Sequence, residues 1–383
     1  MAVAARWVLL CRFIPALGRD DAEAAEPAAD FSVALRSPPR VTFLTAARRV
    51  HPNPNYIDPD AYVLAADRSA VLFRFATSRS AAPTVDRDLV VARHFLPAAS
   101  GGHQRAVTST AFAYRVPRRT APMPVIYALA FIGLVSLHGS DRYGIAELQL
   151  DGTSGNAKLF TFFETDGAWL ERDVILPVAA QGRHFASVGV VPHDGEHLWL
   201  LDLSWGLLSC NPLAIEPVLR FHDLPPGRAV PRYYQALHDE RCVCESKHKL
   251  RFAEIVRGHD SHGRETASVV MWTRIPAADG SGETDHWKNK YEISFAEIWN
   301  HDSYKATQLP PKVPAIVLVS PNDPKLVYFF LEDRLFGVNV PEHRVVHFVT
   351  EQLPGEPNPP TEPASHVRVL PWILPPSISH GNT

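Results

Sequence analysis

The sequence has few cysteines and no strong excess of charge. Only four cysteines, Cys11, Cys210, Cys242 and Cys244, occur in 383 residues, which is too few for a disulfide framework in so long a chain. No Asn-x-Ser/Thr triplet suggests secretion. The net charge of -3 gives no general attraction to nucleic acid or to an anionic membrane. We therefore expect an intracellular protein, cytoplasmic or nuclear with an organelle left open, without nucleic acid or membrane among its partners.

Long apolar runs and the common phosphate-binding and catalytic motifs are also missing. The longest apolar stretch away from the N-terminus, Val125 to Leu137, is too short to span a bilayer. Arg6 and Arg12 interrupt the N-terminal run, so Trp7 to Phe13 is expected to be the opening strand, with a transit peptide as the alternative. No Walker-type loop, dinucleotide loop, His-Glu-x-x-His or Gly-x-Ser-x-Gly motif occurs. No cofactor is expected, and a non-enzymatic protein is favoured over an enzyme.

Proline and turn dipeptides are abundant instead. The chain has 34 prolines, which shorten helices and punctuate strands. Asp-Gly pairs separate short apolar runs, as at Asp166-Gly167 between KLFTFF and the run from Trp169 to Leu176. This pattern predicts an all-β fold with little helix.

The clearest strand pattern lies between Val190 and Pro225. Asp194-Gly195 is a hairpin dipeptide, because it readily supplies positive backbone dihedrals. Leu198 to Leu203 is nearly continuous apolar sequence and predicts a strand covered on both faces. A break at Ser204-Trp205-Gly206 precedes a second strand, and Val218 to Phe221 predicts a third. The stretch is therefore interpreted as one antiparallel sheet.

Asp202, Ser204, Trp205 and Gly206 form a structural signature at that break. The Asp and Ser side chains are expected to bond backbone amides, and Trp205 to fill space between sheets. Gly206 is expected to take a backbone dihedral that other residues do not tolerate. A catalytic Ser204 is the alternative, but no histidine has a predicted place beside it. No catalytic residue is therefore assigned.

The same pattern returns between Asn322 and Pro354. Four positions correspond: Asp194 with Asp323, Leu207-Leu208 with Leu335-Phe336, Asn211 with Asn339, and Leu224-Pro225 with Leu353-Pro354. A four-stranded propeller blade takes roughly 40–50 residues, so the offset of about 128 residues predicts three blades. The expected fold is a β-propeller-like ring of six or seven small antiparallel sheets, forming one domain over residues 5–375 with a disordered tail at 376–383. The alternative is that any two β-meanders share turn residues.

The basic stretch from Ser100 to Pro124 is harder to assign. It contains Arg105, Arg115, Arg118 and Arg119. Such a stretch is usually a solvated loop, and nucleic-acid contact is the alternative.

Three polar groups are candidates for chemistry. Zinc requires four N or S ligands, and His238, Cys242, Cys244 and His248 supply the right types in an unusual spacing. The competing interpretation is a buried strand with both cysteines on one face, flanked by exposed histidines. His259, Asp260 and His262 are expected to form a solvated loop. Glu164 and Asp166 have the residue types of a glycosidase pair, but their spacing indicates a turn.

A family resemblance rests on the run Leu201 to Leu208 and on Asn211-Pro212 with Leu219 to Phe221. Further matches lie at Lys249 to Phe252, Phe295 to Trp299, Ser303 to Thr307 with Leu309-Pro310, Tyr328 to Leu331 and Leu335 to Val338. These residues resemble the plant family catalogued as domain of unknown function 1618, most strongly over residues 186–348. The segment Arg105 to Leu137 departs from the family pattern, through an insertion or a gene-model error. The resemblance implies a plant intracellular protein and no known reaction.

The first functional hypothesis is a non-enzymatic module that presents loops to a protein partner. The alternative is a hydrolase that uses polar residues at the channel of the ring, and a third hypothesis is a zinc-stabilised interaction domain. Convergence of His184, His193, His238 and Asp302 would favour the hydrolase. The sequence leaves the partner and the oligomeric state open.

Overall fold

A computed structural model of the chain describes residues 6–14, 29–50, 61–75, 88–97, 107–126, 128–136, 142–151, 155–231, 236–277, 285–349 and 368–379. These residues form strands β1 to β25 and four α-helices of four to six residues each. The expectation of an all-β fold with little helix is therefore confirmed.

Four of the sheets are consecutive four-stranded antiparallel meanders, in which neighbouring strands follow one another in the sequence. The first holds β9 (Ile132–Ser136), β10 (Tyr143–Leu150), β11 (Asn156–Phe163) and β12 (Trp169–Ile175). The second holds β13 (Val190–His193), β14 (His197–Asp202), β15 (Gly206–Cys210) and β16 (Arg220–Asp223). The third holds β17 (Arg241–Ser246), β18 (Lys249–His259), β19 (Glu265–Ile275) and β20 (His286–Ser294). The fourth holds β21 (Ala315–Val319), β22 (Leu326–Leu331), β23 (Arg334–Asn339) and β24 (Arg344–Phe348).

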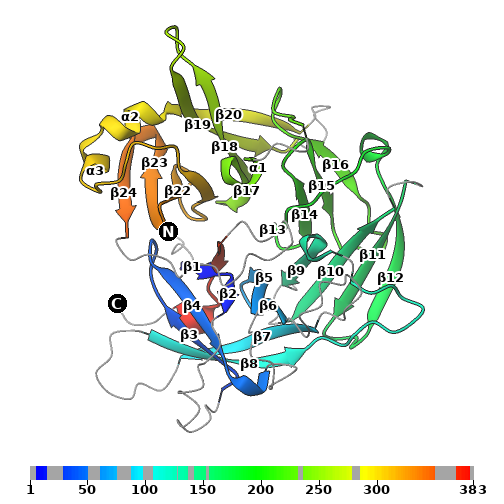
Figure 1. The fold of residues 1–383 in the computed structure, drawn as a ribbon. Coiled ribbons are helices and arrows are strands. Elements are labelled where there is room, and N and C mark those ends of the chain that lie inside the picture. Colours follow the sequence, from blue (N-terminus) through cyan, green and yellow to red (C-terminus); the bar gives the residue numbers. More distant parts are fainter. Residues whose placement is uncertain are drawn as a thin grey trace.

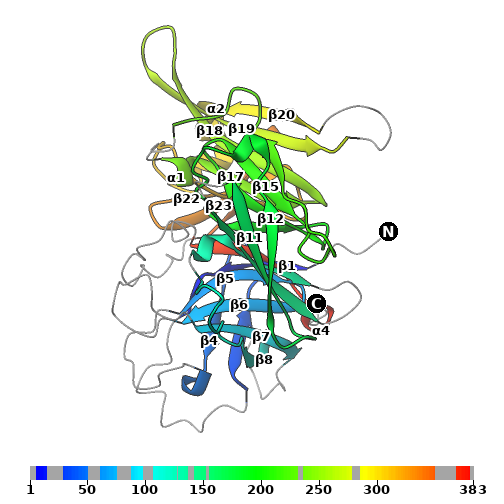
Figure 2. The same cartoon turned by 90° about the vertical axis from the view of Figure 1, so that its right-hand side faces the viewer.

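The fifth sheet has nine strands in the order β2-β5-β6-β7-β8-β3-β4-β1-β25. Its members are β1 (Trp7–Cys11), β2 (Phe13–Ile14), β3 (Phe31–Leu35), β4 (Val41–Ala46), β5 (Ala61–Asp67), β6 (Ala70–Phe75), β7 (Asp88–Pro97), β8 (Val107–Arg115) and β25 (Val369–Ile373). The opening strand β1 pairs antiparallel with the last strand, β25, and parallel with β4. The first and last strands of the chain are thus joined in one sheet, which occupies the lower part of Figures 1 and 2.

The helices are short: three lie between strands, and α4 follows the last strand, β25. They are α1 (Leu237–Glu240), α2 (Phe295–Asn300), α3 (Asp302–Lys305) and α4 (Pro376–Ser379), with 3-10 turns at Arg48–Val50, Leu129–Phe131, Val178–Ala180 and Val340–Glu342. Ser294 and Glu297 form a capping box that starts α2. Helix α4 corrects the predicted disordered tail: Ile378 is buried in the core of the nine-stranded sheet, and this contact orders residues 376–379.

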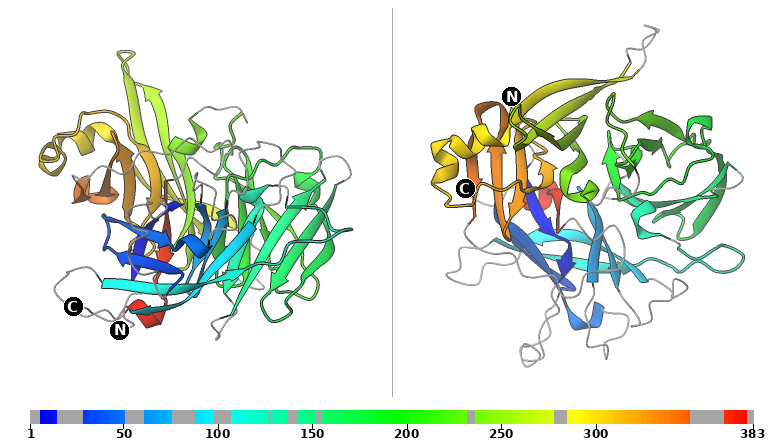
Figure 3. Two further views of the ribbon diagram at one scale, coloured as in Figure 1. Left: turned by 60° about the horizontal axis from the view of Figure 1, so that its bottom comes forward. Right: turned by 45° about the horizontal axis from the view of Figure 1, so that its top comes forward.

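Hydrophobic clusters pack each sheet against the next. One residue pair from each cluster illustrates this: Val91 and Phe160, Leu148 and Leu200, Leu201 and Phe252, Val269 and Phe329, and Tyr328 and Leu9. Following these pairs leads from β7 through the four meanders and back to β1. Figures 1 and 3 show the sheets arranged in this order around a ring. The propeller-like arrangement of small sheets is therefore present.

The two repeated segments occupy equivalent places. Leu208 on β15 pairs with Leu200, and Phe336 on β23 pairs with Phe329, each between the second and third strands of its sheet. Only the β17–β20 sheet separates the two, so the offset covers two sheets and the prediction of three was wrong. That sheet is long because β18 and β19 have 11 residues each and because α2 and α3 follow it. The predicted match at Leu353-Pro354 lies outside the described residues.

The basic segment is only partly a solvated loop. Residues 107–115 form β8 and the Arg119 side chain is buried, so the expectation was wrong for these, whereas most of residues 117–122 are exposed outside any strand. The Arg119 side chain is only 2% exposed and lies 4.3 Å from the Phe160 ring centroid and 4.2 Å from that of Trp169. It forms an ion pair of 2.5 Å with the fully buried Glu147. Arg118 pairs with Asp88, and Arg115 donates to the Val50 carbonyl. Arg105 lies outside the described residues.

Candidate binding surfaces

The signature at the β14–β15 break is a buried hydrogen-bond centre. Asp202 is 1% exposed, and its carboxylate accepts from the Ala186 amide at 2.7 Å and the Ser204 amide at 3.0 Å. It also accepts from the Ser204 hydroxyl and from Trp205 Nε1. Four donors around one carboxylate fix the break and the preceding segment together. The Asp202 carboxylate thus bonds two backbone amides, whereas within the described residues the Ser204 hydroxyl bonds Asp202 and no amide.

Gly206 is required for a reason different from the one expected. It is absent from the described glycines with a positive φ. A Cβ atom at this position would lie 2.3 Å from the Phe221 ring, far inside van der Waals contact. Phe221 stacks on Trp205 with a centroid distance of 4.8 Å, and both rings pack on the cluster between the β9–β12 and β13–β16 sheets. Gly206 therefore makes room for a ring on the adjacent strand.

A second polar cluster contains the residue types of a catalytic triad. His222 Nε2 lies 2.8 Å from Ser209 Oγ, and His222 Nδ1 lies 3.9 Å from Asp285 Oδ2. Arg274 comes between the last two, with Nη2 2.8 Å from His222 Nδ1 and an ion pair to Asp285. Trp199 packs over the imidazole at a centroid distance of 4.4 Å.

The proton arrangement of this cluster is opposite to that of a serine nucleophile. A guanidinium only donates hydrogen bonds, so His222 Nδ1 is the acceptor and its Nε2–H donates to Ser209. In a triad, Nδ1–H donates to the carboxylate and Nε2 accepts the serine proton. Burial, followed by the charge of Arg274, lowers the pKa of His222 to about 4. The ring is therefore neutral near pH 7 and serves as a structural link between β16 and β19.

The four residues of the zinc hypothesis do not form a metal site. Cys242 and Cys244 lie on one face of β17 and pack on the core, as the competing interpretation expected. The His248 side chain is 81% exposed and lies 3.6 Å from Glu245, while His238 is on α1. In the described part of the chain, no group of three or more His, Cys, Asp or Glu side chains is placed to hold a metal ion.

The polar residues suggested for a channel site are also separate. His193 on β13 bonds Glu245 at 2.7 Å, and His184 is exposed in the segment before β13. Asp302 is fully exposed on α3, which Figure 1 shows at the outer edge of the ring. His238 lies on α1. These four residues therefore form no common site.

The two remaining polar groups lie at turns. Asp260 accepts from the His262 and Arg264 amides and closes the β18–β19 loop. Asp166 precedes Gly167, which has φ of 66° in the β11–β12 turn, and Glu164 forms an ion pair with Arg93 of β7. Glu164 is thus bound to another sheet and is not paired with Asp166.

Exposed aliphatic side chains gather on two neighbouring segments. Among the described residues, the four most exposed large hydrophobic side chains are Ile215 (95%), Val178 (84%), Ile175 (78%) and Val218 (63%). We call these four residues the aliphatic rim. They come from the end of β12 with its following turn and from the loop between β15 and β16.

The two segments of the aliphatic rim are held together. Arg172 on β12 donates to the carbonyl oxygens of Ala214 at 2.7 Å and Pro212 at 2.8 Å. Val174 and Leu176 from one segment and Leu213 and Leu219 from the other belong to the same hydrophobic cluster. The rim is therefore a surface formed at the junction of two sheets, where apolar exposure is unusual for a soluble monomer.

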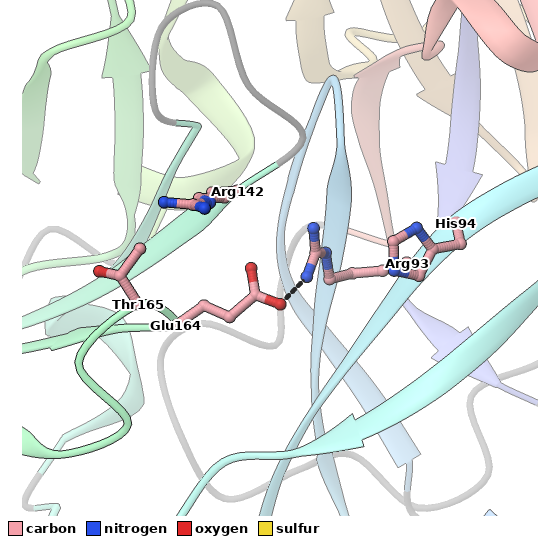
Figure 4. A pocket seen from close by; sticks show the side chains of 5 residues that line it. All are labelled: Arg93, His94, Arg142, Glu164 and Thr165. Atoms are coloured by element: carbon pink, nitrogen blue, oxygen red, sulfur yellow. Dashed lines mark hydrogen bonds and ion pairs between the residues drawn. The ribbon is translucent and has the colours of Figure 1, made fainter.

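A polar pocket of about 420 Å³ lies at another junction. It is lined by Arg93, His94, Arg142, Glu164 and Thr165 (Figure 4). The first two residues lie on β7, Arg142 directly precedes β10, and the last two belong to the β11–β12 turn. The pocket thus lies between the nine-stranded sheet and the β9–β12 sheet.

The sequence analysis missed both the aliphatic rim and the pocket. The rim has a weak local signal, because Ile215 and Val218 are apolar residues in a loop that also contains Pro212 and Pro217. The pocket has none, since Arg93 and His94 stand inside the strand sequence DLVVARHFLP. Their neighbours Arg142 and Glu164 come from a different sheet.

The sheets define a propeller-like all-β fold. Residues 199–328 match the family described as "Protein of unknown function (DUF1618)". This match supports, over that segment, the resemblance noted from the sequence. No curated protein matches the chain.

Solved structures give one further comparison. The catalytic domain of the Coprinopsis cinerea GH62 alpha-L-arabinofuranosidase is 14% identical, with 74% of each chain covered and a TM-score of 0.29. A similarity at this level says nothing about activity. The described residues include no helix long and apolar enough to cross a membrane.

Proposed function

We propose that this chain is a non-enzymatic protein-binding module and that the aliphatic rim is its docking surface. The observation that carries the proposal is the gathering of the four most exposed large aliphatic side chains on two segments that pack together. Several exposed apolar side chains on segments that pack together support an interaction site, because exposed apolar patches mark such sites. The partner is a protein that presents an apolar segment to the rim.

The rim is suited to binding because its support is rigid. The loop that carries Ile215 is held by Arg172 through two backbone carbonyls, so little ordering is required on association. Asn211 closes the start of the same loop, with its side-chain oxygen accepting from the Leu213 amide at 2.8 Å. A preformed apolar surface loses less conformational entropy on binding than a mobile one.

The ring is proposed to consist of six blades. The nine-stranded sheet divides into β25-β1-β4-β3 and β8-β7-β6-β5, joined between β3 and β8, with β2 added to β5. Together with the four meanders this gives six four-stranded units, within the range expected from the sequence. A plant origin and an intracellular location stay predictions, and the four cysteines are free thiols in accord with the latter.

The test compares partner binding by three forms of the full chain. The first form is the wild type, and the second, the rim variant, combines Ile215→Asp with Val178→Asp to place two charges on the rim. The third form is the control, Val346→Asp, which changes another exposed valine on β24. Proteins crosslinked to the wild-type chain are identified, and the affinity of each is then measured with purified components.

The proposal predicts that a partner of the wild-type chain and of the control binds the rim variant at least about tenfold more weakly. Unaltered binding by the rim variant would remove the rim as the docking surface. Sedimentation of each form shows whether the partner is a second copy of this chain.

A further inference from the structure

The last strand of the β9–β12 sheet has an open edge. β12 lies at the end of its sheet, and among the described residues only β11 pairs with it. Figure 1 shows it at the outside of the ring. An edge strand presents a row of backbone N–H and C=O groups to which another strand can add, and proteins usually protect such edges with lysine, proline, a bulge or short length.

The last strands of the other three meanders carry these protections, whereas β12 does not. β16 has four residues, and the register of β24 with β23 is shifted. β20 contains Lys288 and Lys290, and its register with β19 is shifted. β12 has seven residues without lysine or proline, and its register with β11 is unbroken. Of these four edges, β12 is therefore the one best suited to an added strand.

The register shows which backbone groups of β12 face outward. The Leu176 amide donates to the Gly155 carbonyl, and hydrogen-bonded pairs alternate along an antiparallel ladder. The backbone N–H and C=O groups of Glu171, Asp173 and Ile175 therefore point away from β11. No other backbone group in the described part of the chain bonds them. They are placed to bond an incoming strand.

An added strand would meet different side chains on the two faces of β12. Side chains alternate along a strand, so Glu171 and Asp173 share one face and Arg172 lies on the other. Arg172 donates to two carbonyls of the loop that carries Ile215 and Val218. One face is thus acidic, and the other is continued by the aliphatic rim.

The acidic face favours basic side chains in the partner. The Asp173 side chain is 89% exposed, and Glu171 forms an ion pair with Lys158, which also lies 3.8 Å from Asp173. Arg119 also interacts with Glu171, but it is buried in an ion pair with Glu147. Two carboxylates against one exposed ammonium leave one negative charge. Two copies of β12 paired antiparallel would place carboxylates opposite each other, which is unfavourable, so a second copy fits this edge poorly.

We propose that an extended segment of the partner protein, with basic and apolar side chains in alternation, adds antiparallel to the outer edge of β12 as a fifth strand. Its basic side chains lie beside Glu171 and Asp173, and its apolar side chains contact Ile215 and Val218 of the aliphatic rim. In such an addition the main-chain hydrogen bonds provide affinity and the alternating side chains provide specificity. The inference rests on the proposed function and adds the class of its partner.

Fluorescence anisotropy of labelled peptides with the full chain tests the proposal. The peptides have seven residues, the length of β12. The first alternates lysine and valine, and the second has glutamate in place of each lysine. We expect the lysine peptide to bind with a Kd below roughly 1 mM and the glutamate peptide at least about tenfold more weakly.

Two methylated forms of the lysine peptide test the backbone hydrogen bonds. Lysines opposite Glu171 and Asp173 have backbone nitrogens that face β12, because those pairs are hydrogen-bonded. Methylation of the lysine nitrogens should therefore weaken binding at least about tenfold. Methylation of the valine nitrogens, which face solvent, should leave it nearly unchanged.

Variants of Asp173 separate charge from backbone on the protein side. Asp173→Asn keeps the outward N–H and should weaken binding of the lysine peptide about threefold, whereas Asp173→Pro removes both and should weaken it about tenfold or more. Asp302→Asn on α3, at another exposed aspartate, should leave binding unchanged. A melting curve shows whether Asp173→Pro is folded, and the methylated peptides test the proposal even if it is not.

The proposal is overturned if the lysine peptide does not bind, if its glutamate or lysine-methylated form binds as tightly, or if Asp173→Pro folds and behaves like Asp302→Asn. Sedimentation that shows a wild-type dimer and an Asp173→Pro monomer would assign the edge to a second copy and would also overturn it. Unaltered partner binding by the rim variant refutes the proposed function. Weakened partner binding by that variant, together with failure of the peptide test, refutes only the added strand.

Discussion

Replacing Asp202 should reveal how much the fold depends on the β14–β15 break. In Asp202→Ala, the amides of Ala186 and Ser204 lose their acceptor inside the protein, and neither can rotate toward another one. Leaving a buried donor without a partner costs about 1–3 kcal/mol. The Ser204 hydroxyl can turn elsewhere, and the partly buried Trp205 N–H can approach water, so they add less. The free energy of unfolding should fall by about 3–5 kcal/mol.

Asp202→Asn keeps one acceptor oxygen in nearly the same volume. It should therefore cost about 2 kcal/mol, less than the alanine variant. Urea denaturation of the full chain, followed by tryptophan fluorescence, measures both changes. Asp223→Asn is the control, because this aspartate is exposed at the end of β16 and should change stability by less than about 0.5 kcal/mol. A loss below about 1 kcal/mol in Asp202→Ala would refute the interpretation of the break as a buried hydrogen-bond centre.

Two further predictions concern the same sheet. Gly206→Ala should cost about 2 kcal/mol or more because its Cβ overlaps the Phe221 ring, and Phe221→Leu in the same chain should recover part of that loss in urea denaturation. Independent, additive effects would show that the ring is not the cause. His222 has a folded pKa of about 4, below its unfolded value, so its contribution to stability is complete above pH 6.5 and is lost as the pH falls toward 4. Stability measured across this range should fall by up to about 3 kcal/mol more in the wild type than in His222→Gln, and parallel pH profiles would contradict the assignment.

The sequence predicted most reliably those features that depend on neighbouring residues. Asp194 and Gly195 have φ of 53° and 78°, as the hairpin dipeptide required. The break after Asp202 and the turn before Trp169 were also recognisable, because backbone conformation there follows from residue type. Such local rules explain why the strands and the family segment could be found.

Features set by distant residues could not be found in this way. Gly206 is needed because of Phe221, which reaches it across the β15–β16 pair. Arg119 was expected at the surface, because the sequence does not show that Phe160, Trp169 and Glu147 contact its side chain. The offset between the two repeated segments was assigned to three sheets and covers two, because the β17–β20 sheet is long and is followed by α2 and α3. The number of residues between two repeated segments therefore does not give the number of sheets between them.

The architecture also determines where binding surfaces can form. The sheets pack their faces against neighbours, and the aliphatic rim and the polar pocket both lie where two sheets meet. The β9–β12 sheet provides parts of both surfaces: Glu164 belongs to the pocket on one side, and Ile175 to the aliphatic rim on the other. β12 connects them, because its first residues follow the pocket turn and its last residue belongs to the rim. A substitution that displaced β12 would therefore alter both surfaces, whereas exposed variants at Arg142 and Ile215 should each affect only one.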